Sequence, residues 1–173
     1  MLVLVAALAG PVAAQVPEPD DYRGEPYRAP VPSTLAGAEV VDAAGAIALH
    51  AQGVPFVDVL PRKTRPPELP EGTVWREPPH ETIPGALWLW NTGYQKLSEV
   101  EHARLVDGLE KASGGDLAAP LVIFCRADCW MSWNAARRAV EMGYQRISWF
   151  PGGIEQWQAA GGAALVSAEP VAP

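Results

Sequence analysis

Both cysteines of the chain, Cys125 and Cys129, lie in a short segment between an apolar run and a helical pattern. The run at 121–124 is typical of a buried strand, and the helical pattern starts at Ser132. A cysteine in this place lies beside the unpaired N–H groups and the positive dipole end of a helix, which favour the thiolate. The pattern therefore predicts a reactive loop in which Cys125 is the nucleophile and Ser132 caps the helix.

The second cysteine, Cys129, leads to the hypothesis that the loop performs redox chemistry. Three intervening residues allow the two Cα atoms to come within the roughly 4.4–6.8 Å that a disulfide spans. Arg126 would favour the thiolate of its neighbour Cys125, and Asp128 would disfavour that of Cys129, an asymmetry that suits an attacking and a resolving thiol. The rest of the predicted active loop comprises Arg126, Ala127, Asp128, Trp130, Met131 and Ser132.

Three alternatives to redox chemistry stay open. The pair could be a permanent disulfide, although so short a ring removes little entropy from the unfolded chain. It could also be two buried free thiols that serve as small apolar groups. Two thiolates also suit Cu(I) or Zn(II), with His80 as a third ligand, although a closed zinc site has four ligands. No cofactor is expected beyond such a carried metal.

The aromatic residues after the second cysteine have two interpretations. Trp130 and Trp133 lie three positions apart and share one face of a helix. Core or lid packing is the ordinary role of aromatic residues in a first helical turn. The alternative is an exposed surface that anchors a partner, and solvent accessibility separates the two.

Two further residues could support the loop. Asp58 lies near the end of a predicted buried strand at 55–60, and we expect it to accept backbone hydrogen bonds or to pair with an arginine rather than to perform acid–base chemistry. Arg62 opens a proline-rich insertion at 61–79, directly after a strand end, where α/β proteins build sites. A solvated loop with scattered charges is the simpler interpretation of that insertion.

Strands and helices alternate along the rest of the chain. Asp42 is placed to cap a helix over 43–52, and Ser98 with Glu101 forms a capping box for a helix that reaches about residue 111. The remaining predicted elements are short strands at 40–41, 87–90 and 146–150 and helices at 132–142 and 154–160. Such alternation predicts an α/β fold with a mostly parallel sheet flanked by helices on both faces.

The sequence predicts an exported protein with a single domain. Residues 1–14 are an apolar run that ends in small residues at Ala14, the pattern of a cleavable signal peptide. Residues 15–37 read as an extended arm, 38–162 as the domain and 163–173 as a flexible tail. No apolar run is long enough for a stable membrane anchor. A net charge of −7 argues against nucleic-acid partners.

The order of landmarks over 38–162 resembles the rhodanese-like domain. The landmarks are Val57-Asp58-Val59, Ile83-Pro84-Gly85-Ala86, the strand that ends in Cys125, Ala135-Ala136, Gly143-Tyr144, Gly152-Gly153-Ile154 and Trp157. The resemblance implies that Cys125 is the position that would carry a persulfide. The loop departs from the family pattern because it is one residue longer and ends in Trp130-Met131 instead of an arginine, which weakens anion binding.

A narrower resemblance concerns the Cys-x3-Cys-Trp loop and the arm sequence Asp21-Tyr22-Arg23. These features are similar to exported rhodanese-like proteins associated with PQQ-dependent (quinoprotein) alcohol catabolism. The similarity implies a periplasmic accessory role, with a quinoprotein dehydrogenase or a thiol-redox partner. Thiol–disulfide oxidoreductase or sulfurtransferase activity would follow from the cysteines, and a non-catalytic partner or copper carrier that binds through the same loop is the alternative.

Overall fold

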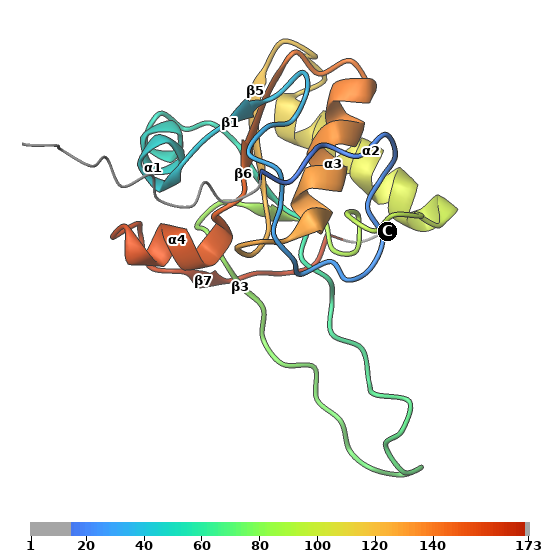
Figure 1. Cartoon of the computed structure of the whole chain (residues 1–173). Coiled ribbons are helices and arrows are strands. Elements are labelled where there is room, and N and C mark those ends of the chain that lie inside the picture. The colour runs from blue at the N-terminus through green and yellow to red at the C-terminus, as the bar shows by residue number, and fades with distance from the viewer. Residues whose placement is uncertain (1–14, 172–173) are drawn as a thin grey trace, which may run out of the picture.

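Five parallel strands form the central sheet of the computed structural model, in the order β1-β6-β5-β2-β4 (Figure 1). The strands are β1 (Glu39–Val40), β2 (Phe56–Asp58), β4 (Leu87–Trp88), β5 (Pro120–Phe124) and β6 (Arg146–Phe150). The structure describes residues 15–171, so the predicted signal peptide at 1–14 lies outside the described residues. Within the described part of the chain, no helix combines the length and apolar character needed to cross a membrane.

Helices cover both faces of this sheet (Figure 1). One face carries α2 (Glu99–Ser113) and α3 (Trp130–Glu141), and the other carries α1 (Ala43–Ala51) and α4 (Gly153–Ala159). The predicted α/β architecture with a mostly parallel sheet and helices on both faces is therefore confirmed.

Side chains along β5 alternate between the two faces of the sheet and so place Cys125 on one of them. Leu121, Ile123 and Cys125 pack into the core that includes α3, whereas Val122 and Phe124 pack into the core on the α4 side. This period of two is the geometry of a strand whose two faces are both covered. Cys125 consequently points into the core beneath α3, and its residue is fully buried.

The helix caps at Asp42 and Ser98 follow the sequence signals. The Gly45 amide donates to Asp42 Oδ1 at 2.8 Å, at the start of α1. Ser98 and Glu101 form the predicted capping box at the start of α2. Because side-chain oxygens satisfy otherwise unpaired N–H groups, both helices begin where the sequence predicts.

The start of α3 differs from the prediction. The helix begins at Trp130 with Cys129 as its N-cap, so the assignment of Ser132 as the cap is wrong. The Ser132 hydroxyl instead donates to the Cys129 carbonyl at 3.1 Å and accepts a hydrogen bond from Trp149 Nε1 at 3.0 Å. The Ser132 side chain, which the local sequence pattern assigned to the helix cap, thus forms a tertiary hydrogen bond with β6.

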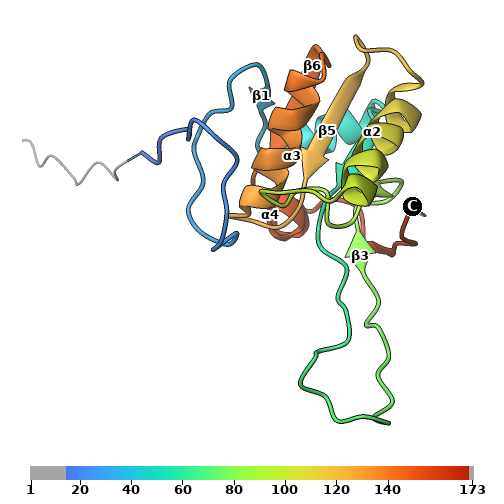
Figure 2. The ribbon, with the colours of Figure 1, turned by 90° about the vertical axis from the view of Figure 1, so that its right-hand side faces the viewer.

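Both terminal segments lie against the domain. The arm runs beside α3, where the Arg137 guanidinium donates to the carbonyls of Pro19 and Asp20 (Figures 1 and 2). At the other end, the segment that we expected to be a tail forms β7 (Val166–Ser167), which pairs antiparallel with β3 (Glu81–Thr82). The chain then follows β4, and the Val171 amide donates to the Trp88 carbonyl at 3.3 Å.

The insertion at 61–79 projects from the body of the domain as a long loop between β2 and β3 (Figure 2). A two-point ion pair closes its base, because Arg62 Nε and Nη2 each donate to the Glu77 carboxylate at 2.7 Å. The loop is thus anchored at the edge of the sheet where the parallel strands end.

Candidate functional site

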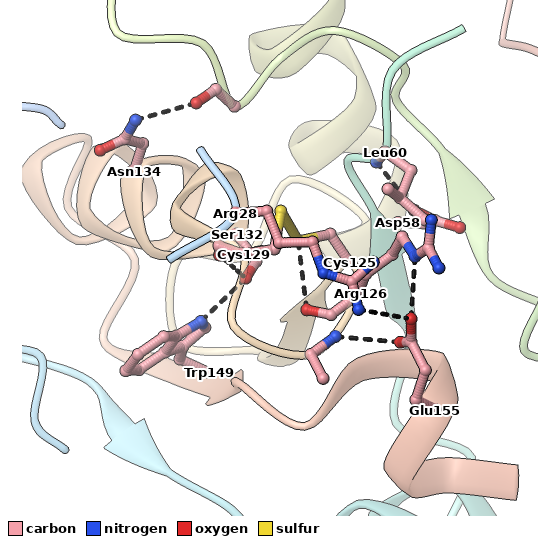
Figure 3. Close-up of a disulfide and its surroundings, with 12 residues drawn as sticks. Arg28, Asp58, Leu60, Cys125, Arg126, Cys129, Ser132, Asn134, Trp149 and Glu155 are labelled. Atoms are coloured by element: carbon pink, nitrogen blue, oxygen red, sulfur yellow. Dashed lines mark hydrogen bonds and ion pairs between the residues drawn. A yellow bond between two sulfur atoms is a disulfide. The ribbon is translucent and has the colours of Figure 1, made fainter. Parts of the chain in front are cut away.

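The two cysteines lie at disulfide distance at the carboxyl end of β5 (Figure 3). Their Cα atoms are 6.5 Å apart, inside the range of about 4.4–6.8 Å that disulfides use. Neither is free. Only 6% of Cys129 is exposed, and Cys125 is fully buried. The arrangement supports the prediction that this loop can hold an intramolecular disulfide.

The surroundings of the two sulfur atoms differ from the predicted arrangement. Cys125 Sγ lies 3.6 Å from the Arg126 carbonyl oxygen and 3.7 Å from the Cys129 carbonyl oxygen. Carbonyl oxygens disfavour negative charge on a neighbouring sulfur. Cys129 is the N-cap of α3 and receives the positive end of the helix dipole. Cys129 rather than Cys125 thus lies at the start of α3.

The Glu155 carboxylate on α4 accepts hydrogen bonds from the loop (Figure 3). Glu155 Oε2 accepts from the Ala127 amide at 3.0 Å, and Oε1 accepts from Arg126 Nε at 2.8 Å. Arg28 Nη2 lies 3.6 Å from the same Oε1. Burial raises the pKa of Glu155, but the Ala127 amide and the Arg126 guanidinium outweigh that effect and hold the pKa below its usual value. Arg126 thus forms an ion pair with Glu155.

The arm covers the second cysteine by pairing with the loop as a short antiparallel bridge between Arg28 and Cys129. The Ala29 amide donates to the Asp128 carbonyl at 3.0 Å, and the Trp130 amide donates to the Tyr27 carbonyl at 2.8 Å. Asp128 adopts a left-handed backbone with φ 52°, which Asp tolerates better than most residues. The first amide of α3 is therefore occupied by a backbone carbonyl of the arm.

Comparison with known proteins identifies the family. The profile of the rhodanese-like domain matches residues 47–160, more than half of the chain. The chain belongs to the rhodanese-like domain family. A search of curated proteins found no match.

Three solved structures are similar to this rhodanese-like chain. A protein of unknown function from Rhodopseudomonas palustris, described as a possible tyrosine phosphatase, is 22% identical with a TM-score of 0.43, over 74% of this chain and 85% of that one. A rhodanese-like domain from Anabaena sp. is 17% identical with a TM-score of 0.45, over 77% and 91%. An uncharacterized protein from Saccharomyces cerevisiae is 20% identical with a TM-score of 0.38, over 71% and 92%.

The aromatic residues of the rhodanese-like loop are packed inside. Trp130 is 4% exposed and Trp133 is 1% exposed, and their rings contact each other edge to face at 5.5 Å. Met131 is also buried, at 3%. The packing interpretation is confirmed, and the alternative of an exposed docking surface is wrong.

Asp58 lies fully buried at the end of β2. Its Oδ1 accepts from the Leu60 amide at 2.9 Å, which confirms the expected backbone hydrogen bond. Its Oδ2 accepts from the Thr82 hydroxyl at 2.7 Å and lies 2.7 Å from His80 Nε2. The side-chain partner of Asp58 from this loop is thus a histidine and not an arginine, and Arg62 is held by Glu77 instead.

Sequence reasoning missed the residues that hold the arm and the loop in place. Asn134 is fully buried in α3; its Oδ1 accepts from the Arg23 amide and its Nδ2 donates to the Arg23 carbonyl, both at 2.9 Å. A polar residue on the core-facing side of a helix could have been recognised in the sequence, because a buried amide side chain needs hydrogen-bond partners. No local pattern marked Glu155 or Arg28, because their contacts join distant segments.

The surroundings of the loop bear on the metal alternative. Among residues 15–171, no group of three or more His, Cys, Asp or Glu side chains is arranged to hold a metal ion. His80, the expected third ligand, contacts Asp58 and stacks on Trp88 with ring centroids 4.0 Å apart.

Proposed function

We propose that this rhodanese-like protein is a periplasmic accessory protein whose Cys125 and Cys129 cycle between a disulfide and a dithiol. The observation that carries the proposal is the placement of both cysteines at disulfide distance in the loop before α3. Sulfur transfer from an anionic donor is less well supported, since Glu155 already uses the Ala127 amide and Arg126 Nε.

The exchange step begins at Cys129 in this proposal. A partner thiolate attacks Cys129 Sγ, the S–S bond breaks, and Cys125 leaves with the electron pair and takes up a proton. A second partner thiol, after losing its proton, displaces Cys129 from the mixed disulfide. The partner dithiol is oxidised to a disulfide by two electrons, and the cysteine pair is reduced by the same two.

Two features support Cys129 as the attacked and attacking sulfur. Cys129 retains slight exposure, whereas Cys125 is completely buried. Cys129 also caps α3, and the positive end of the helix favours its thiolate. This assignment reverses the roles that the sequence predicts for the two cysteines.

The cellular role rests on resemblance. The Cys-x3-Cys-Trp loop and the Asp21-Tyr22-Arg23 arm are similar to exported proteins of PQQ-dependent alcohol catabolism. We place the protein in the periplasm, beside a quinoprotein dehydrogenase or a thiol-redox partner. An oxidising compartment suits a protein whose resting form is a disulfide.

The first experiment is the intact mass of the protein purified from the periplasm without reductant, followed by free-thiol labelling. A mass two hydrogens below that of the reduced chain, no label before reduction and two labels after it are expected. A mature chain that begins at Gln15 would support export. Two free thiols in the oxidising compartment would contradict the proposal.

A pair of single substitutions tests the order of attack. The Cys129 thiol of Cys125→Ser should react with iodoacetamide faster than the Cys125 thiol of Cys129→Ser. The reverse order would return the nucleophile to Cys125. Thiocyanate formation from thiosulfate and cyanide that depends on Cys125 alone would identify a sulfurtransferase and overturn the redox assignment.

A further inference from the structure

A cavity of about 250 Å³ lies on the α4 side of the sheet, and neither cysteine lines it. Lys63 and Pro79 line it from the base of the projecting loop, and Ile154 lines it from α4. Drug-sized ligands occupy pockets of roughly 300–1,000 Å³, so this cavity suits a smaller molecule. It is a second concave site beside the loop that carries the disulfide.

One wall of the cavity is a histidine held in a fixed orientation. His80 stacks on Trp88 and contacts the Asp58 carboxylate through Nε2. Its Nδ1 has no hydrogen-bond partner within residues 15–171. His80 Nδ1 thus remains available to a polar group of a ligand at the cavity wall.

Two cations line the same space. Lys63 makes no ion pair among the described residues. Arg126 gives only Nε to Glu155, which leaves its two terminal nitrogens for a ligand. Of the two carboxylates that line the cavity, that of Glu77 is paired with Arg62, and that of Glu81 is exposed and makes no ion pair among the described residues. The cavity lining therefore offers charged hydrogen-bond donors on two residues, Lys63 and Arg126, and one unpaired carboxylate.

We propose that this cavity binds a small organic carboxylate. The carboxylate would lie between Lys63 and Arg126, because charge-assisted hydrogen bonds from more than one donor fix an anion best. The apolar part of the ligand would lie against Leu60, Ile154 and Leu165. This apolar lining separates the expected ligand from a bare inorganic anion.

The test uses benzoate as the probe and benzamide as its uncharged counterpart. The readout is the NMR signal of the Trp88 indole N–H, which donates to the Leu60 carbonyl at 2.8 Å at the cavity wall. We expect a saturable shift with benzoate, weaker binding of benzamide and of sulfate, and about fivefold weaker benzoate binding in Lys63→Gln. The matched control, Lys111→Gln, removes the same charge from α2, away from the cavity, and should not change the affinity.

Several results would overturn the proposal. These are the absence of a saturable shift, equal binding of benzamide or sulfate, or an equal loss of affinity in Lys111→Gln and Lys63→Gln. The cysteine pair stays intact in every variant, so failure here leaves the redox proposal untouched.

Discussion

The carboxylate of Glu155 accepts a hydrogen bond from the backbone amide of Ala127 at 3.0 Å and so ties α4 to the loop between the two cysteines. The same carboxylate binds Arg126 at 2.8 Å. An amide and a guanidinium are the groups with which a protein loop holds an external anion. In this chain an internal anion, the Glu155 carboxylate, takes that place at the Ala127 amide and at Arg126 Nε.

Glu155→Gln should destabilise the fold at neutral pH by about 1 kcal/mol, because it removes charge-assisted contacts that are partly exposed to solvent. Folding lowers the pKa of Glu155 from 4.5, so its contribution is complete above pH 4.5 and is lost as the pH falls through the lower folded value. Urea unfolding at pH 7 and at pH 3 measures this. Glu110→Gln, an exposed control on α2, should show no such loss, and a penalty that grows at low pH would contradict the prediction.

Ala29→Pro should speed reduction of the disulfide by dithiothreitol about fivefold, the effect of one hydrogen bond on a local opening equilibrium. The substitution removes the amide that donates to the Asp128 carbonyl, next to Cys129. Timed acid quenching and mass spectrometry give the rate. Ser33→Pro is the control, since that exposed arm residue donates no backbone hydrogen bond within 15–171. Equal rates in both variants would show that the arm does not limit access.

Ser132→Ala should lower the free energy of unfolding by about 1–3 kcal/mol, because the buried indole N–H of Trp149 loses its acceptor. Denaturant titration followed by circular dichroism provides the value. Ser148→Ala serves as the control, since Ser148 is 7% exposed and its hydroxyl has no partner among the described residues. If the two variants lost the same stability, the Ser132 hydrogen bond would not be the cause.

Gly153→Ala should destabilise the protein more than Gly161→Ala. Both glycines have a positive φ, 53° and 76°, so a side chain at either costs about 1 kcal/mol. A Cβ at Gly153 would also lie 2.4 Å from the Cys125 carbonyl oxygen, whereas a Cβ at Gly161 meets nothing within 4 Å. Overpacking of this kind adds about 1–3 kcal/mol. Matched thermal unfolding curves would test the difference, and equal midpoints would refute it.

The sequence was sufficient for the elements whose signals are local. The apolar run before Cys125 predicts β5 and its burial, and the caps at Asp42 and Ser98 predict the starts of α1 and α2. The family resemblance was predictable for the same reason, because its landmarks are short motifs in a fixed order.

The remainder depends on contacts between segments that are distant in sequence. Serine is a residue type that often caps helices, but the Ser132 hydroxyl accepts a hydrogen bond from Trp149 on β6. Cys129 occupies the N-cap position instead, and Arg28 of the arm pairs with it. Glu155 is distant in sequence from the loop whose Ala127 amide it binds. Periodicity and spacing carry no information about such pairings, so the partners of the loop could not be predicted from the sequence.

The C-terminal segment along β4 also bears on self-association. β4 is the outermost strand of the sheet, and an open strand edge is a template for pairing with other protein molecules. Here Val171 donates to the Trp88 carbonyl and accepts from Trp90 Nε1, so the chain covers its own edge. The opposite edge strand, β1, has only two residues. The fold therefore leaves little open strand on which aggregates could grow.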